Sequence, residues 1–239
     1  MCFFYSLPKN AKEIQKRYNK QLSLFDDTAF EGKYLIKGYD HLNSNFIITN
    51  DNTIQIAKWG LVPFWSKPDY VETIQKENRN VNAKEETIFT LASFRLPIKQ
   101  HRCLVPSSGW FEYHYENGKV KDIYYIYVKD TDIYSFAGIY DYWHDKETGE
   151  EIMSYAIITA PANKLMTFIH NGGKNPRRMP VILRKEDEEK WLNPDTTKEE
   201  LEALMQPFPD ELMDAYPIKK DSKEFRNANP FDPDLLDKL

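Results

Sequence analysis

The sequence predicts a single α+β domain, and three observations support this class. Strand-like segments rich in aromatic and β-branched residues recur between residues 46 and 162. Helix-like segments with charged faces precede, interrupt and follow them. No stretch long enough to serve as an interdomain linker separates these elements, and 239 residues can bury one large core. We therefore expect one domain over residues 1–239, with an acidic helical part from about residue 186 onward.

The first half of the chain alternates between helical and strand-like patterns. KNAKEIQKRYNKQL places Ile14, Tyr18 and Leu22 four residues apart among lysines, which predicts an amphipathic helix. NFIITNDNTIQIAKWGLVP predicts two strands around the turn-forming NDN. Short helices are expected next in KPDYVETIQKENRN, with Pro68 near its start, and in EETIFTLASF.

Beyond residue 101 the pattern is mainly that of strands, in RCLVP, GWFEYHY, DIYYIYV, IYSFAGIYDYW and MSYAIITAPAN. NGK and DTD between them are hairpin signals. Alternation within GWFEYHY places Phe111 and Tyr113 on one face and Glu112 on the other. After MPVIL, the segments RKEDEEKWL and TTKEELEALM predict two acidic helices, which an irregular Pro-rich tail follows.

Composition excludes several classes of protein. No stretch approaches ~18 consecutive apolar residues, and the N-terminus lacks a basic segment followed by an apolar one, so we expect neither a membrane span nor a secretory signal. The only cysteines are Cys2 and Cys103, which fits a reducing interior without disulfides. We expect a cytoplasmic protein, associated with the nucleoid when it binds DNA. Cys103 lies in an apolar run and is expected in the core.

The net charge of −5 hides an uneven distribution. Residues 186–239 contain 16 acidic and 7 basic side chains, which leaves 21 acidic and 25 basic ones in residues 1–185. Because a polyanion meets a local surface, this basic excess permits a nucleic-acid face in the first part of the chain. It does not by itself demonstrate one.

Cys2 directly follows the initiator methionine in MCFFYSLPKN. The simpler explanation is a small packed side chain at a terminus. The alternative is chemical, because removal of Met1 would leave a free α-amine and a thiol on one residue, a 1,2-aminothiol. This stretch alone favours the simpler explanation.

Signatures of metal sites and phosphate loops are missing from the sequence. The two cysteines are far apart, no His pair has i, i+4 spacing, and NGGK at 171–174 lacks the other residues of a P-loop. We therefore expect no metal and no cofactor.

Four further segments set polar groups in rigid apolar sequence. They are VNAKEET with Asn82, PSSGWFEYH with Glu112, TFIHN with His170, and KWGLVPFW with Trp59, Phe64 and Trp65. Each has an ordinary explanation when taken alone: a strand carboxylate at the surface, a hydrogen-bonded loop histidine, and tryptophans in the core.

Together with Met1-Cys2, these segments resemble the SOS-response-associated peptidase (SRAP) family, which shields abasic sites in single-stranded DNA. The resemblance runs through WGLVPFW, NAKEET, RCLVPSSGWFEY and ITAPAN to IH and RMPVIL, and so covers nearly the whole chain. The order and spacing of several unrelated motifs argue against accidental similarity. The resemblance implies an SRAP-like fold, in which a mixed β-sheet curls into a pseudo-barrel with peripheral helices.

The chain departs from the family pattern in four places. The family usually begins Cys-Gly-Arg, whereas Phe3 and Phe4 follow Cys2 here. Its Asn-Ala-Arg becomes Asn82-Ala83-Lys84, which keeps the charge but loses the guanidinium fork. Its His-Asp-Arg-Met-Pro is interrupted by NGGKNPR between His170 and Arg178. The second tryptophan often seen after WGL-x-P is represented by Phe64-Trp65.

The resemblance implies catalytic roles for Cys2, Asn82, Glu112 and His170. An α-amine with a pKa of about 7.7–8.0 can attack the aldehyde of a ring-opened abasic sugar, and the tethered thiol then closes a thiazolidine. Glu112 would relay protons at the amine, His170 would protonate the leaving oxygen of the sugar ring, and Asn82 would hold the amine.

The implied partner is single-stranded DNA that contains abasic sites, bound by a monomer. The candidate phosphate contacts are Lys84, Arg95, Arg102, Arg177 and Arg178. Trp59, Phe64 and Trp65 are the candidates for stacking on bases, which is worth roughly 1–3 kcal/mol per base. The family also implies thiol autopeptidase and abasic-site lyase activities.

Three other functions remain open at this stage. A cysteine peptidase would use Cys2 as its nucleophile, with Met1-Cys2 as one substrate, and would turn over peptides in trans. An N-terminal-nucleophile amidotransferase would require a second substrate domain, which we do not expect in a chain of this length. A non-covalent single-stranded-DNA-binding module would leave no covalent product.

Overall fold

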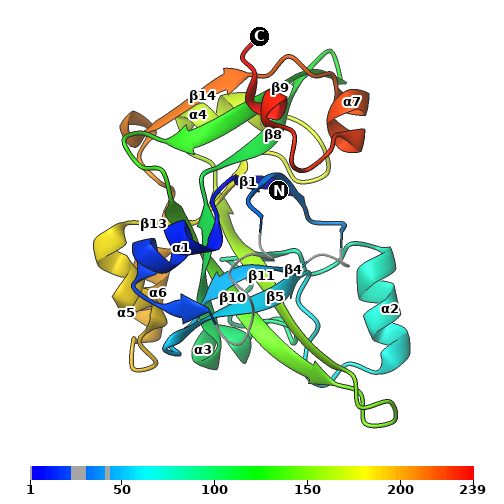
Figure 1. Cartoon of the computed structure of the whole chain (residues 1–239), viewed down its shortest axis with the longest axis vertical. Helices are drawn as coiled ribbons and strands as arrows, with labels where there is room; N and C mark the ends of the chain where they lie inside the picture. The colour runs from blue at the N-terminus through cyan, green and yellow to red at the C-terminus, as the bar shows by residue number, and fades with distance from the viewer. Residues whose placement is uncertain (1, 23–30, 41–43) are drawn as a thin grey trace.

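The computed structural model describes residues 2–22, 31–40 and 44–239 (Figure 1). A closed barrel of five strands forms its body. In order around the ring these are β11 (Glu151–Pro161), β10 (Tyr134–His144), β7 (Arg102–Ser107), β4 (Ser44–Ile48) and β5 (Thr53–Trp59). Neighbours are antiparallel as far as β5, which then pairs parallel with β11 at Tyr155–Trp59 and closes the ring. Met1, whose removal the sequence-based mechanism requires, lies outside the described residues.

Short strands extend this sheet at its edges. β6 (Asn82–Lys84) runs parallel to β11, and β12 (Arg178–Pro180) runs antiparallel to it. β13 (Ile182–Leu183) pairs with β10, and β2 (Gln21–Leu22) pairs with β5. β11 therefore carries two of the segments that the sequence motifs single out.

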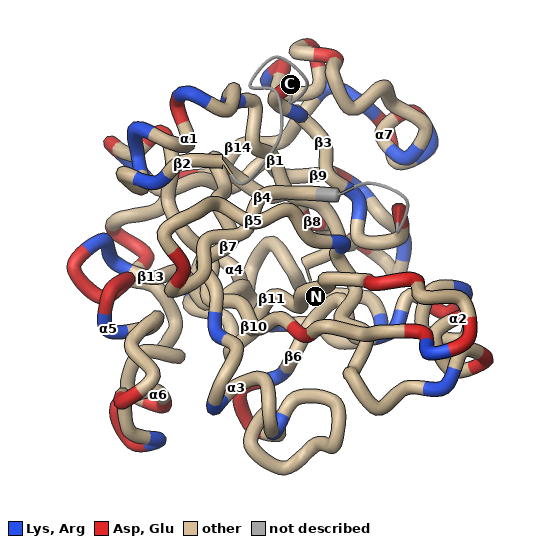
Figure 2. The backbone as a smooth tube through the Cα atoms, turned by 60° about the horizontal axis from the view of Figure 1, so that its bottom comes forward, with Lys and Arg blue, Asp and Glu red and all other residues tan. Residues whose placement is uncertain are grey.

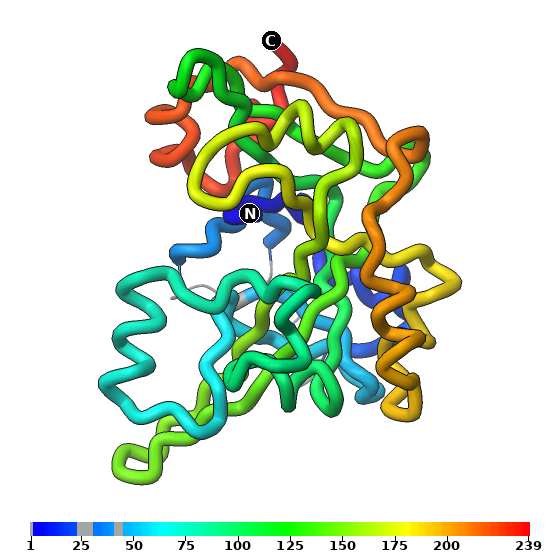
Figure 3. Tube along the Cα trace, turned by 180° about the vertical axis from the view of Figure 1, so that it is seen from behind, coloured from blue at the N-terminus to red at the C-terminus, as the bar shows by residue number. Residues whose placement is uncertain are grey.

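A second sheet lies beside the barrel and holds the N-terminal strand. Its order is β14 (Met213–Pro217), β9 (Lys119–Val128), β8 (Gly109–Glu116), β1 (Phe4–Leu7) and β3 (Lys33–Lys37). Because β1 pairs with both β8 and β3, the start of the chain is fixed on two sides. Figures 1 and 3 show the N-terminus between the two sheets.

The chain passes from the barrel into this second sheet within two residues, from the end of β7 to Gly109. A Cβ on Gly109 would overlap the ring of Tyr125, so glycine is required there. The β8–β9 hairpin turns at Asn117 (φ 52°) and Gly118 (φ 76°), which confirms the NGK prediction. The DTD prediction is wrong, because the chain at 130–132 crosses from β9 in one sheet to β10 in the other.

The helices cover the outside of the two sheets (Figure 1). The helical segments are α1 (Ala11–Tyr18), α2 (Pro68–Lys76), α3 (Pro97–Gln100), α4 (Lys164–Ile169), α5 (Glu188–Leu192), α6 (Lys198–Leu204) and α7 (Ser222–Asn227), with 3₁₀ turns at Lys185–Asp187, Asp210–Leu212 and Pro233–Leu236. The described chain contains no helix with the length and apolarity needed to cross a membrane.

The amphipathic helix expected near the N-terminus is confirmed as α1. Asn10 caps it, since its Oδ1 accepts from the Glu13 amide at 3.1 Å while the Glu13 carboxylate accepts from the Asn10 amide at 2.8 Å. The helix ends before Leu22 because Asn19 adopts a left-handed conformation (φ 52°).

The prediction of a helix in EETIFTLASF is wrong. Residues 85–94 form successive turns, in which most of the local hydrogen bonds join an amide to the carbonyl three residues back, as from Phe94 to Leu91. A single bond there spans four residues, from the Leu91 amide to the Thr87 carbonyl. The Thr90 hydroxyl also donates to the Thr87 carbonyl at 3.0 Å, which competes with helical bonding. The helix α3 begins only at Pro97.

The acidic helices after residue 185 are confirmed as α5 and α6, which lie beside the barrel, and α6 shows its acidic positions in Figure 2. Farther along the chain, β14 forms an edge strand of the second sheet, and α7 packs on that sheet. Phe225 of α7 packs on Phe111 with ring centroids 4.9 Å apart, and Tyr113 lies on the same side. This arrangement confirms the alternation in β8, which turns Glu112 toward the opposite face.

Candidate active site

Cys2 is completely buried immediately before β1. Its Sγ donates to the Phe4 carbonyl at 3.6 Å, and its own carbonyl accepts from Asn82 Nδ2 at 2.8 Å. Cys103, in β7, is also buried, as expected from its apolar neighbours. The two cysteines are both unpaired thiols, but only Cys2 lies beside the polar candidates.

Asn82 reaches Cys2 from β6. The strand is held by its pairing with β11, and Trp59 Nε1 donates to the carbonyl of the preceding Val81 at 2.8 Å. Asn82 Oδ1 is buried and accepts no hydrogen bond from any described residue. Because a buried oxygen without a donor is costly, this position suits an N–H group that belongs to the start of the chain.

Glu112 and His170 face each other from β8 and from the end of α4. Each is 5% exposed, and Glu112 Oε2 lies 3.9 Å from His170 Nε2. His170 Nδ1 lies 2.9 Å from the Arg178 carbonyl oxygen and 3.4 Å from the Arg178 amide nitrogen. The shorter contact favours a hydrogen on Nδ1, because a carbonyl oxygen can only accept. The other ring nitrogen, Nε2, is then directed at the carboxylate. The 3.9 Å distance is longer than a hydrogen bond, so the two side chains face each other across the site and each can exchange a proton with a bound substrate.

The Cys2 thiol is electrostatically unsuited to ionisation. Burial raises the pKa of this thiol, and the nearby Glu112 carboxylate raises it further. Reactive thiolates in peptidases need the opposite environment, one that lowers the thiol pKa. The site therefore does not favour the Cys2 thiolate as the first nucleophile.

We expect iodoacetamide to label the folded protein slowly at pH 8. Burial raises the pKa of the Cys103 thiol as well, so neither cysteine supplies much thiolate at that pH. Mass spectrometry after timed labelling should show both thiols reacting quickly only in denaturant. Rapid labelling of Cys2 in the folded protein would contradict the buried, protonated thiol.

A pocket of about 350 Å³ opens onto the Glu112–His170 pair. Phe3, Tyr113 and Tyr115 contribute to its walls, and residues 172–175 form its far side. Figure 3 shows the segment after α4, in yellow, passing beside the N-terminus. The structure thus places Glu112 and His170 at this pocket. Cys2 and Asn82 do not line it, but Asn82 bonds to Cys2, and the Cys2 thiol is near enough to Glu112 to feel its charge.

The aromatic candidates for base stacking divide into two groups. Trp59 is 1% exposed and packs parallel to Tyr155, so its prediction as a DNA contact is wrong: its ring supports β5 and β6 from within the core. Phe64 and Trp65 are 53% and 46% exposed, and Trp65 stacks on Tyr70. They precede α2, whose far end leads to Glu77 at the pocket, about 14 Å along the helix axis.

The prediction of Arg102 as a phosphate contact is also wrong. Its side chain is buried, and its guanidinium donates to backbone carbonyls of Ile98, Lys99, Trp191 and Asn193 at 2.5–2.9 Å. These bonds tie α3 and α5 to β7. Charge reversal at this position would therefore test folding rather than DNA contact.

The remaining basic candidates differ in their availability. Arg178 is 8% exposed and forks onto the Glu86 carboxylate while donating to the Thr159 carbonyl at 2.7 Å, so it too is wrong as a free phosphate contact. Arg95 and Arg177 are exposed. Lys84 is half-buried, and its Nζ donates to Asn175 Oδ1 at 3.0 Å.

Sequence reasoning did not assign a role to the segment that separates His170 from Arg178. Lys174 and Asn175 of this segment line the pocket, and Asn175 also accepts from Lys84. Asn171 accepts a hydrogen bond from the amide of Tyr115, which lines the pocket. The signal that could have identified them was the insertion itself, because added residues next to a candidate catalytic histidine must lie close to it.

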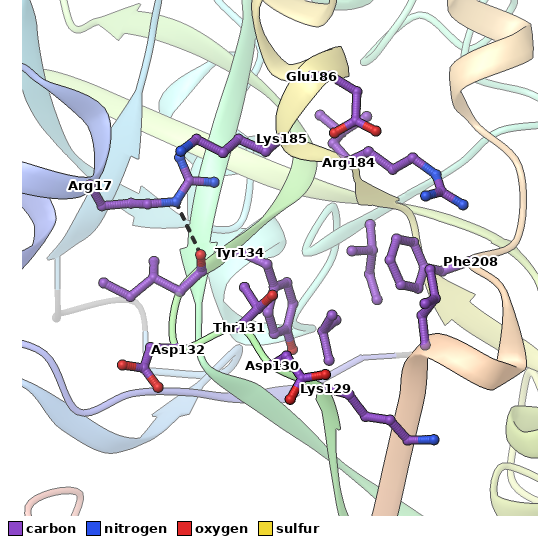
Figure 4. Close-up of a pocket in the computed structure, with 15 residues that line it drawn as sticks. Arg17, Lys129, Asp130, Thr131, Asp132, Tyr134, Arg184, Lys185, Glu186 and Phe208 are labelled. Carbon is purple, nitrogen blue, oxygen red and sulfur yellow. Dashed lines mark hydrogen bonds between the residues drawn. The ribbon is translucent and has the colours of Figure 1, made fainter.

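A second pocket, of about 470 Å³, lies elsewhere, between the 129–134 connection, β13 and Phe208 (Figure 4). Arg17 at its edge donates to the Ile133 carbonyl at 3.1 Å and forks onto Glu188, while Arg184 lies over the Phe208 ring. None of the four candidate catalytic residues lines this pocket.

The described chain is of the α+β class, a closed mixed barrel beside a second sheet, with a buried cysteine next to its N-terminal strand. The chain belongs to the SOS response associated peptidase (SRAP) family, whose model matches residues 1–224. The α+β pseudo-barrel expected from the motifs is confirmed. A crystal structure of a Bacteroides thetaiotaomicron protein superimposes with a TM-score of 0.92 at 39% identity and covers 100% of both chains.

Two of the named relatives are called abasic site processing proteins. The abasic site processing protein YoqW of Bacillus subtilis is 31% identical over 96% of this chain and 97% of its own. The abasic site processing protein HMCES of Gallus gallus is 28% identical over 76% of this chain and 57% of its own. A Bordetella bronchiseptica structure at 22% identity, with a TM-score of 0.77, covers 92% of this chain and all of its own, and shares the fold.

Proposed function

We propose that this protein captures abasic sites in single-stranded DNA, through a covalent thiazolidine formed by the α-amine and thiol of Cys2 after Met1 is removed. The observation that carries the proposal is the buried Asn82 amide: Nδ2 holds the Cys2 carbonyl, while Oδ1 has no donor among the described residues. Membership of the SRAP family and the names of its relatives supply the substrate class.

The first step is opening of the abasic sugar. The cyclic hemiacetal breaks its bond between the anomeric carbon and the ring oxygen, the ring oxygen gains a proton, and the anomeric hydroxyl loses one to give an aldehyde. His170 lines the pocket, and its imidazolium form can supply the proton to the ring oxygen. The Glu112 carboxylate, 3.9 Å away, can take the proton that the anomeric hydroxyl loses.

The second step joins the amine to the aldehyde. The neutral α-amine, held by Asn82 Oδ1, attacks the carbonyl carbon, and loss of one water leaves an imine. Glu112 is placed to take the amine proton and return it to the departing oxygen. The thiol then adds its sulfur to the imine carbon and its proton to nitrogen, which closes the ring with no further loss of atoms.

The raised pKa of the Cys2 thiol favours this order of events over a thiol peptidase acting in trans. Capture also consumes the N-terminus, so each protein molecule reacts once. Cleavage of the Met1–Cys2 bond by the protein itself is compatible with capture, because it would expose the aminothiol.

The proposal is tested with an abasic single-stranded oligonucleotide and a panel of unstructured peptides. We expect a protein–DNA adduct that survives denaturing electrophoresis, saturates at one equivalent, and is absent with an intact oligonucleotide. Peptide turnover beyond one equivalent without such an adduct would instead identify a peptidase. Reversible binding alone would identify a non-covalent module.

A further inference from the structure

Two departures from the family pattern meet in the structure. Lys84 replaces the arginine of Asn-Ala-Arg, and residues 171–177, here called the 171–177 loop, separate His170 from Arg178. Lys84 Nζ donates to Asn175 Oδ1 of this loop at 3.0 Å. The substitution and the insertion are thus in direct contact beside the pocket.

The 171–177 loop is firmly anchored at its base. The Arg177 amide donates to the His170 carbonyl at 2.8 Å, which closes the loop. Asn171 pairs with the backbone of Tyr115 in β8, accepting from its amide at 2.8 Å and donating to its carbonyl at 2.9 Å. A Cβ on Gly172 would lie 2.5 Å from Tyr115 Cγ, so the loop approaches this ring as closely as a glycine allows.

The tip of the loop brings positive charge to the pocket. Lys174 is exposed and is the one lysine or arginine among the residues that line it. Of the acidic side chains there, Glu77 is already bonded to Arg79 at 2.7 Å. Neither Lys174 nor Lys84 forms an ion pair with a described residue. Lys84 does interact electrostatically with Glu86, but that carboxylate is already bonded by Arg178. Two ammonium groups therefore lie close to the pocket outside any ion pair among the described residues.

We propose that the 171–177 loop and Lys84 form a phosphate-binding edge of the pocket, which takes a backbone phosphodiester next to the captured sugar. This inference rests on the proposed function, since that function brings DNA to the pocket. Lys174 supplies one contact directly. Asn175 is a positioning residue that orients Lys84 for another.

The chemistry of the Lys84–Asn175 contact explains why an asparagine suits this place. An ammonium is a point charge on a flexible stem, whereas the arginine of the family pattern has a rigid planar fork. A neutral amide oxygen can fix the direction of the ammonium without cancelling its charge. A carboxylate at the same distance would hold the lysine equally well and neutralise it.

The test uses the full chain and an abasic single-stranded oligonucleotide. It measures, at several salt concentrations, the DNA concentration that gives half the maximal rate of adduct formation, which serves as the apparent affinity. Each phosphate contact with a single strand contributes about 0.7 to the slope of log affinity against log salt. We expect Lys174→Ala to reduce that slope by about 0.7 and to weaken half-saturation about fourfold near 0.15 M salt. The rate at saturating DNA should change little, because the chemistry lies at Cys2.

Asn175→Asp separates positioning from simple loop structure. The substitution keeps the shape of the side chain but places a carboxylate 3.0 Å from Lys84, so it should reduce the slope by a similar amount. Asn175→Ser, which keeps a neutral acceptor, should retain more of the wild-type slope. Lys190→Ala on α5 is the matched control for loss of a cation, because Lys190 pairs with Glu200 away from the pocket.

The outcomes distinguish this inference from the proposed function. Absence of any adduct from the wild-type protein overturns the proposed function itself. A wild-type adduct whose salt slope is unchanged in both Lys174→Ala and Asn175→Asp overturns the phosphate-binding edge alone. Loss of the saturated rate with an unchanged slope would assign the loop to the chemical step, and would equally contradict the inference.

Discussion

Cys2→Ala should yield no denaturation-stable adduct with abasic single-stranded DNA. The variant retains an α-amine and can still form an imine, but it lacks the sulfur that closes the ring, so its adduct should appear only after borohydride reduction. The tethered thiol accounts for this difference, because its effective concentration at the imine carbon far exceeds that of any thiol in solution.

Cys103→Ala provides the matched control for this experiment. Cys103 is equally buried, lies in β7 and donates nothing to the pocket, so its loss should leave the stable adduct in place. Electrophoresis with and without borohydride separates the two kinds of product. A wild-type amount of stable adduct from Cys2→Ala would rule out the thiazolidine.

Substitutions at Glu112 and His170 should have different effects on two kinds of aldehyde. If His170 promotes opening of the sugar, His170→Ala should slow capture of abasic DNA but spare reaction with a small aldehyde that is permanently open. If Glu112 relays protons at the amine, Glu112→Gln should slow both reactions by about 10²–10⁴-fold, the range typical of general acid–base catalysis.

The two side chains face each other at 3.9 Å, so damage to the pocket as a whole would affect both variants alike. Adduct rates for both proteins on both aldehydes, at fixed pH and salt, resolve the question. Equal losses across the four rates would mean that Glu112 and His170 shape the pocket and carry no separate chemical step.

Local patterns in the sequence predicted the strands β4, β5 and β7 to β11 and the helices α1, α2, α5 and α6, but not the shorter elements. The alternation in β8 correctly predicted that Glu112 lies on the face opposite Phe111 and Tyr113. The spacing of apolar residues correctly predicted α1, which Asn10 caps. Spacing failed at 85–94, where threonine hydroxyls compete with helical hydrogen bonds. It also failed at 130–132, because a turn signal does not say whether the following strand returns to the same sheet.

The features that the sequence did not predict depend on pairing between segments that are far apart in the chain. Closure of the barrel depends on the parallel contact between β5 and β11, which joins segments nearly 100 residues apart in sequence and leaves no local pattern. The same packing buries Trp59 and Arg102, which were candidates for DNA contact because of the single-stranded DNA partner that the family resemblance implied. The four candidate catalytic residues came from the family resemblance. The structure adds the hydrogen bond from Asn82 to Cys2 and the 3.9 Å approach of Glu112 to His170.

The most direct test of the central claim is the intact mass of the purified protein, measured before and after reaction with an abasic oligonucleotide. The account predicts a reactive chain that begins at Cys2, and a product equal to that chain plus the oligonucleotide less one water. Peptide mapping should then locate the modification on the N-terminal residue. An adduct on a chain that retains Met1, or one that maps to an internal lysine, would contradict capture by the N-terminal aminothiol.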